Sequence, residues 1–163
     1  MQPLPSQQLN PKIKAVWRIN DAIWIIVCYL ICMVPCAIVA AAEPGDKWPL
    51  LLMIIFTVLF AVLLILFLVI LPPVRYARWS YQLSEDYLDI ARGIFWRKRF
   101  IIPFIRVQNT DSRQGPILRA FGLSSVTVSD AAGSHEIPGL DSAEAEALRD
   151  KAAELARLAR EDV

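Results

Sequence analysis

Two groups of residues in this 163-residue chain have side-chain types that could do chemistry. His135, the single histidine, stands between a serine and a glutamate, the residue types of a hydrolytic triad. Cys28, Cys32 and Cys36 recur at every fourth position, so on a helix they would share one face, a spacing that could serve metal ligation or a redox relay.

Neither group is completed by further partners. No His, Asp or Glu lies in the apolar segments that surround the cysteines, and cysteine is also a small residue suited to close helix packing. The glycines are dispersed and form neither a P-loop nor a dinucleotide fingerprint. We therefore predict no enzyme, no catalytic residue, no metal and no cofactor, and we expect His135 to be a surface histidine.

A third group is the basic cluster Arg97, Lys98 and Arg99 in the stretch GIFWRKRFIIPFIRV. Residues 72–119 hold nine Lys/Arg against four Asp/Glu, whereas residues 120–163 hold four Lys/Arg against nine Asp/Glu. The first half of this part of the chain is therefore basic and the second half acidic. Candidate contacts with lipid or a partner are Arg97, Lys98, Arg99 and Arg106. Aromatic residues interleave with the cluster, as in nucleic-acid sites, but the net charge of +1 disfavours that partner. We predict that the protein binds neither a nucleic acid nor a small-molecule substrate.

Two apolar segments without charged residues are the most prominent feature of the sequence. They are Ile23 to Ala42 and Trp48 to Leu71, and hydrophobic residues make up 56% of the chain. As helices they would be roughly 30 and 36 Å long, enough to cross a hydrocarbon core of about 30 Å. A signal peptide is the alternative for the first segment, but its apolar run is long and a second span follows after five residues. A transmembrane hairpin is predicted, and its lack of charge disfavours a transporter.

The orientation follows from the positive charges beside the spans. Lysines and arginines flank both outer ends of the hairpin, whereas the loop between the spans carries Glu43, Asp46 and a single Lys47. Both termini should therefore be cytoplasmic. The predicted organisation is an N-terminal segment at 1–22, a hairpin at 23–71 with helices 23–42 and 48–71, and a cytoplasmic domain at 72–163.

The cytoplasmic domain alternates in the manner of an antiparallel sheet and then changes period. Alternation predicts strands at 75–83, 87–92, 94–102, 105–112, 123–130 and 133–140. In the third of these, Ile94, Trp96, Phe100 and Ile102 are expected to face the core. Residues 141–160 predict an amphipathic helix that starts with a capping box at Asp141 and closes the open side of a curved sheet. The fold class is membrane-anchored α+β.

The same residues carry a resemblance to a known family. The motifs are Trp79 with Tyr81, Ile102 with Pro103, Arg106 to Gln108, Gln114 to Arg119, Phe121 to Leu123, Ala132 with Gly133, and Ile137 to Leu140. Their order resembles the bacterial pleckstrin-homology-like (PH-like) domain of YdbS-type two-helix membrane proteins. The resemblance implies a seven-stranded, partly open antiparallel β-barrel capped by the C-terminal helix, and no catalytic residues. PH domains that grip phosphoinositides resemble one another in basic residues around the first hairpin loop, where this chain has Ser84, Glu85 and Asp86.

These observations leave three functional hypotheses. The first is a non-enzymatic module for protein–protein assembly at the cytoplasmic face of the bacterial inner membrane, with a membrane protein of the same family or further copies of itself. The alternative is a peripheral sensor or binder of anionic lipid head groups, in which case membrane lipids are the partner. A membrane enzyme remains only if His135 or the cysteines prove essential.

Overall fold

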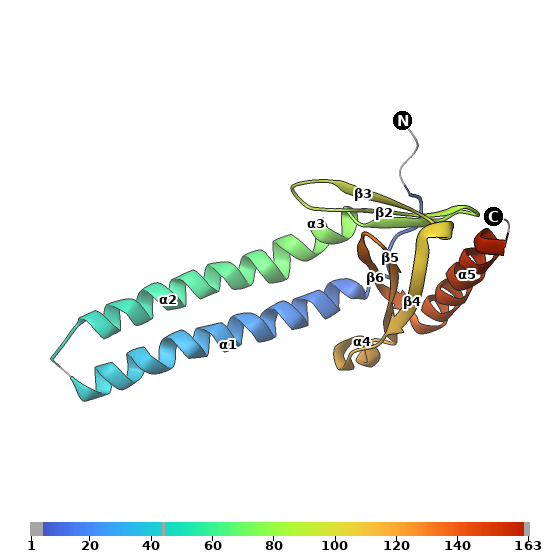
Figure 1. Cartoon of the computed structure of the whole chain (residues 1–163). Coiled ribbons are helices and arrows are strands. Elements are labelled where there is room, and N and C mark those ends of the chain that lie inside the picture. Colours follow the sequence, from blue (N-terminus) through green and yellow to red (C-terminus); the bar gives the residue numbers. More distant parts are fainter. Residues whose placement is uncertain (1–4, 44, 162–163) are drawn as a thin grey trace. The chain divides into compact units, whose positions relative to one another are not determined.

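The computed structural model describes residues 5–43 and 45–161, which form two compact units (Figure 1). One unit is helical and comprises Trp17–Pro73. The other joins the described residues up to Val16 with those from Val74 onward, and it holds all six strands.

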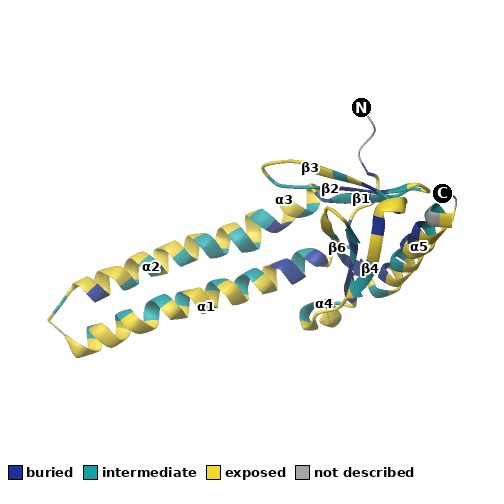
Figure 2. Ribbon diagram, in the orientation of Figure 1, coloured by how far each residue is buried: buried dark blue, intermediate teal, exposed yellow. Residues whose placement is uncertain are grey.

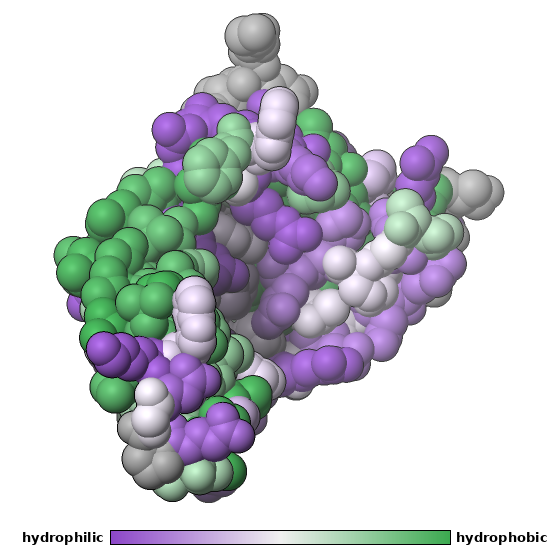
Figure 3. All heavy atoms as spheres, turned by 90° about the vertical axis from the view of Figure 1, so that its left-hand side faces the viewer, coloured by the Kyte–Doolittle hydropathy of each residue, from purple (hydrophilic) through white to green (hydrophobic). Residues whose placement is uncertain are grey.

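Long apolar helices make up the helical unit. They are α1 (Ile13–Ala42), α2 (Trp48–Ile65) and a short π-helix (Leu66–Ile70) that leads into α3 (Leu71–Ala77). Both helical stretches, Ile13–Ala42 and Trp48–Ala77, are long and apolar enough to cross a membrane, and their large side chains are mostly exposed. Figure 3 looks onto the loop end of this unit, where hydrophobic residues, in green, cover much of the visible surface.

Helix α3 corrects one prediction, because residues 75–77 are helical where alternation predicted a strand. The strand β1 (Ser80–Leu83) begins only after Trp79. Pro72 and Pro73 do not end the helix, which runs on from Trp48 to Ala77 and has the π-helical turn Leu66–Ile70 directly before the two prolines.

The six strands of the second unit form two antiparallel sheets of three strands each. The first sheet has the order β1-β2-β3, with β2 at Tyr87–Arg92 and β3 at Lys98–Pro103. The second has the order β4-β5-β6, with β4 at Val107–Arg113, β5 at Leu123–Asp130 and β6 at Gly133–Asp141. Short helical turns, Phe104–Arg106 and α4 (Pro116–Ala120), connect them.

The C-terminal helix α5 (Ser142–Glu161) covers the second sheet, as its apolar stripe predicted. Its buried residues are Ala145, Ala152 and Ala156. Figure 2 shows buried positions of α5 in dark blue. The α+β architecture with a helix closing a sheet is confirmed. The two sheets do not close into one barrel, and the described residues form six strands where the resemblance implied seven.

The chain before the first span belongs to this second unit. Gln7 forms an isolated antiparallel bridge with Tyr81, and Leu9 and Ile13 are buried. The backbone N–H of Asn10 donates to the carbonyl of Gly139 at 3.0 Å. Residues 1–22 were predicted to be a separate N-terminal segment, whereas in the structure the described residues up to Val16 group with the strands.

The third predicted strand corrects a further expectation about the core. Ile102 is buried as predicted, and Phe100 is half-buried. Trp96 was expected inside and is instead 82% exposed, because residues 94–97 form the loop between β2 and β3 and have no paired strand to hold them inward.

Candidate functional site

The β2–β3 hairpin presents two aromatic rings at its tip. The last residue pair of the ladder is Arg92 with Lys98, and the chain turns at Gly93 with φ 127°. A Cβ atom on Gly93 would overlap the carbonyl oxygen of Trp96, so the tight turn requires glycine. Phe95 is 88% exposed and Trp96 82% exposed. Large exposed aromatics side by side mark a surface that contacts something apolar.

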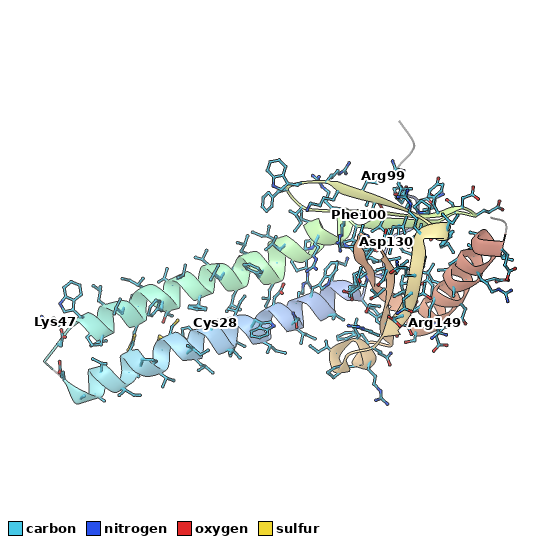
Figure 4. All side chains as sticks on the ribbon, in the orientation of Figure 1. Cys28, Lys47, Arg99, Phe100, Asp130 and Arg149 are labelled. Atoms are coloured by element: carbon cyan, nitrogen blue, oxygen red, sulfur yellow. The ribbon has the colours of Figure 1, made fainter. Side chains whose placement is uncertain are left out.

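Arg99, one of the four predicted contact residues, forms an ion pair within the domain. Its guanidinium donates to the carboxylate of Asp89 through Nη2 at 2.6 Å and through Nε at 3.0 Å. Asp89 is only 3% exposed, and the hydrogen bond with it raises the pKa of Arg99 above its usual range. Figure 4 labels Arg99 beside Phe100 on β3. This pair satisfies a buried carboxylate and leaves Arg99 poorly placed to serve a ligand.

Arg97 and Lys98 are exposed and line two neighbouring pockets at the base of the tip. The larger pocket has a volume of about 430 Å³ and includes Lys98. The smaller one, of about 170 Å³, includes Arg97. Trp79 and Arg92 line both pockets, so they form the wall that the two share.

Three further cations join the predicted ones at these pockets. Arg75 and Arg92 line the larger pocket, and Arg78 and Arg92 line the smaller one. The guanidinium carbon of Arg92 lies 5.3 Å from the ring centroid of Phe100, a cation–π contact that helps to orient it. Arg75 and Arg78 are among the cations that flank the second predicted span and indicate its orientation, whereas Arg92 was not predicted as a contact residue. Arg92 could have been found from its place opposite Lys98 at the end of the hairpin, which brings the two cations together.

The remaining predicted residues lie elsewhere. Arg106 is exposed in the turn at Phe104–Arg106 and lines neither pocket. His135 was expected at the surface but is half-buried, with its ring centroid 4.7 Å from that of Phe100. Its Nδ1 atom is buried and has no hydrogen-bond partner among the described residues. His135 therefore packs against Phe100 of β3.

The cysteines lie on α1 as predicted, where Figure 4 labels Cys28. Cys28 is exposed and Cys32 and Cys36 are half-buried, all three with free thiols. Within the described residues no three or more His, Cys, Asp or Glu side chains come together as a metal site. The absence of a bound metal stays a prediction.

Comparisons with known proteins agree with this architecture. A family model described as bacterial PH domain matches residues 18–156. The transmembrane protein YdbS of Bacillus subtilis (strain 168) is 36% identical over 163 residues, covering all of both chains. Neither description denotes an enzyme. No solved structure matches. The chain, which also carries two helices long and apolar enough to cross a membrane, therefore belongs to the bacterial PH domain family.

Proposed function

We propose that this protein is a non-enzymatic, membrane-anchored PH-like module whose β2–β3 tip contacts the anionic surface of the membrane that its own helices span. The observation that carries the proposal is the exposure of Phe95 and Trp96 next to Arg97 and Lys98. The sequence alone favoured protein assembly over lipid contact. The exposed rings reverse that order, because Trp96, which alternation placed in the core, is available to a membrane together with Phe95.

Magnitudes indicate which part of the tip contributes more. Fully burying a large apolar side chain such as Phe is worth roughly 1.5–3 kcal/mol. A cation near an anionic leaflet contributes about 1 kcal/mol. The rings therefore dominate the contact, and tryptophan is a residue that membrane interfaces favour. Contact through Phe95 and Trp96 should persist at high salt, whereas contact through cations alone would not.

Because the spans anchor the domain at the membrane, the contact of the tip with lipid can be weak and still be formed most of the time. Because the domain is covalently tied to its spans, the tip meets the membrane at a high effective concentration. Chain segments from both outer ends of the helical hairpin belong to one compact unit, which supports placing them on one side of the membrane. The flanking cations support the cytoplasmic side. A reporter fused after Val163 should be active only in the cytoplasm, and external activity would reverse the orientation.

Tryptophan fluorescence in proteoliposomes tests the contact. The signal of Trp96 is the difference between the parent and a Trp96→Phe variant, both reconstituted as full chains. Lipids brominated on their acyl chains should quench this difference signal, at low and at high salt alike. A Trp introduced by Glu85→Trp is the control, since the β1–β2 turn lies at the other end of β2, about 20 Å from the tip. Equal quenching at both positions, or none at Trp96, would contradict the proposal.

A second candidate, assembly with copies of this chain or with a family member, rests on a different surface. Strand β4 lies at the edge of its sheet, and a groove of about 380 Å³ runs between it and α5. Gln108, Asn109 and Thr110 line it on the strand side, and Ala153 and Ala156 on the helix side. An extended segment could add to such an edge. Replacing Thr110 by Pro should abolish complexes seen by mass photometry of the detergent-solubilised chain if this groove holds a partner.

A further inference from the structure

We infer that the larger pocket under the hairpin tip binds the phosphate group of an anionic lipid such as phosphatidylglycerol. The inference rests on the proposed membrane contact and adds to it a ligand class and a defined site. The pocket is separate from the β1–β2 turn, whose Glu85 and Asp86 would repel a phosphate.

The lining of the pocket has the chemistry that a lipid head group needs. Its charged residues are Arg75, Arg92 and Lys98, and none of its described lining residues is a carboxylate. Guanidinium groups bind phosphate oxygens through two parallel hydrogen bonds, and a lysine adds a positive charge. Phe95 and Trp96 stand in the same lining, so one pocket offers cations to a head group and aromatic rings to the adjoining acyl region.

The pocket is also partly pre-organised. Arg92 is held over the ring of Phe100, and Trp79, which forms the shared wall, is 4% exposed. Gly93 contributes backbone without a side chain at the turn. A volume of about 430 Å³ falls within the usual range for small-ligand sites and suits a glycerophosphate group rather than a whole lipid.

One lining residue of the pocket, Arg75, lies close to the predicted span in the sequence. Arg75 follows the end of the predicted span, Leu71, by four residues of the helix α3, a rise of about 6 Å. The head-group layer on each side of a bilayer is about 5 to 8 Å thick. The chain therefore keeps Arg75, one of the lining residues, within reach of the head groups.

Selectivity follows from the charges. A zwitterionic head group such as phosphatidylcholine would bring its own cation to a site lined by Arg92 and Lys98. An anionic head group brings none. The site should therefore prefer phosphatidylglycerol, and inorganic phosphate should bind more weakly because it cannot use the aromatic residues.

The test is thermal unfolding of the full chain in a neutral detergent, with added phosphatidylglycerol, phosphatidylcholine or inorganic phosphate at matched ionic strength. Phosphatidylglycerol should raise the melting temperature of the parent more than the other two ligands do. Arg92→Gln and Lys98→Gln should each weaken its apparent affinity about tenfold. The matched control is Lys151→Gln, an exposed cation on α5, which should respond like the parent. Lys98→Gln changes an exposed side chain, so it remains informative if Arg92→Gln fails to fold.

Three results would overturn the inference. Phosphatidylcholine could stabilise the parent as well as phosphatidylglycerol does, the two pocket variants could respond like Lys151→Gln, or inorganic phosphate could match the lipid, which would make this a soluble-phosphate site. If any of these occurs while Trp96 is still quenched by brominated lipid, the proposed function stands and only the head-group site fails. If Trp96 is not quenched, the membrane contact itself fails.

Discussion

Ile13, at the start of the first long helix, packs directly against the backbone of Gly139 near the end of the last strand. A Cβ atom at Gly139 would lie 2.5 Å from Cγ1 of Ile13, and Gly139 has φ +66°, a conformation that favours glycine. Tyr76, just after the second span, donates its hydroxyl to the carbonyl of Leu9 at 2.9 Å. The ammonium of Lys14 lies 4.6 Å above the ring of Tyr76. The segment before the spans is thus an integral part of the PH-like unit.

Truncating Ile13 should therefore unfold the PH-like unit more readily. Ile13→Ala removes a buried side chain and should cost about 2–5 kcal/mol. Gly139→Ala should also destabilise, because it combines a strained backbone with a clash. Ile105→Ala is the matched control, since Ile105 is exposed and should change stability by less than about 0.5 kcal/mol. Thermal unfolding of the full chain in detergent measures all three, and equal effects for Ile13 and Ile105 would show that the packing is unimportant.

The three members of the basic cluster should differ in their effect on stability. Arg99→Gln should lower the melting temperature, because it leaves the buried carboxylate of Asp89 without its ion pair. Arg97→Gln and Lys98→Gln should leave the melting temperature almost unchanged, since both side chains are exposed. The three variants are compared by circular dichroism melts. An Arg99 variant as stable as the other two would mean that the pair with Asp89 does not support the fold.

Tyr81 predicts a loss of stability in alkali. Burial, together with the nearby charge of Glu144 and a 3.0 Å hydrogen bond to it, raises the pKa of Tyr81 well above its ordinary value of about 10. The folded protein then keeps a proton that the unfolded chain releases, so this contribution is complete below pH 10 and declines as the pH rises further.

Tyr81→Phe should cost about 1 kcal/mol at neutral pH through the lost hydrogen bond. It should also flatten the fall in unfolding free energy above pH 10. Denaturant unfolding at a series of pH values measures both effects. If the parent and the variant lose stability in parallel above pH 10, another group is responsible.

The cysteines of α1 are expected to act only in packing. Replacing Cys28, Cys32 and Cys36 together by Ala should leave the helical unit folded at a modest cost, because each change removes a small apolar group. Tyr29→Ala is the control, since Tyr29 joins α1 to α2 through a 3.3 Å hydrogen bond with Thr57 and an edge-on ring contact with Phe60. Elemental analysis of the purified parent should find no stoichiometric metal, and a metal lost on triple substitution would show that the cysteines are ligands.

Periodicity in the sequence predicted the helices and most strands because it depends on local side-chain patterns. It failed at Phe95 and Trp96, since alternation of aromatic residues looks the same in a strand and in the loop that follows Gly93. Only the ladder ending at Arg92 and Lys98 settles which it is.

The candidate site could be predicted only in part, for a related reason. Arg97 and Lys98 were found from their clustering, but separating Arg99 from them required the strand pairing that brings it to Asp89. The meeting of Arg75 and Arg92 with Lys98 depends on three different elements of the fold, so no local pattern records it.

The depth of the hairpin tip in the membrane tests the central claim most directly. A nitroxide is attached at Phe95→Cys in the full chain lacking its three native cysteines, reconstituted into vesicles containing phosphatidylglycerol. Glu85→Cys in the same background is the control at the far end of β2. We expect the nitroxide at position 95 to collide with oxygen and to be shielded from a water-soluble nickel chelate, whereas position 85 should be accessible to the chelate. Equal access of the chelate to both positions would contradict the membrane contact.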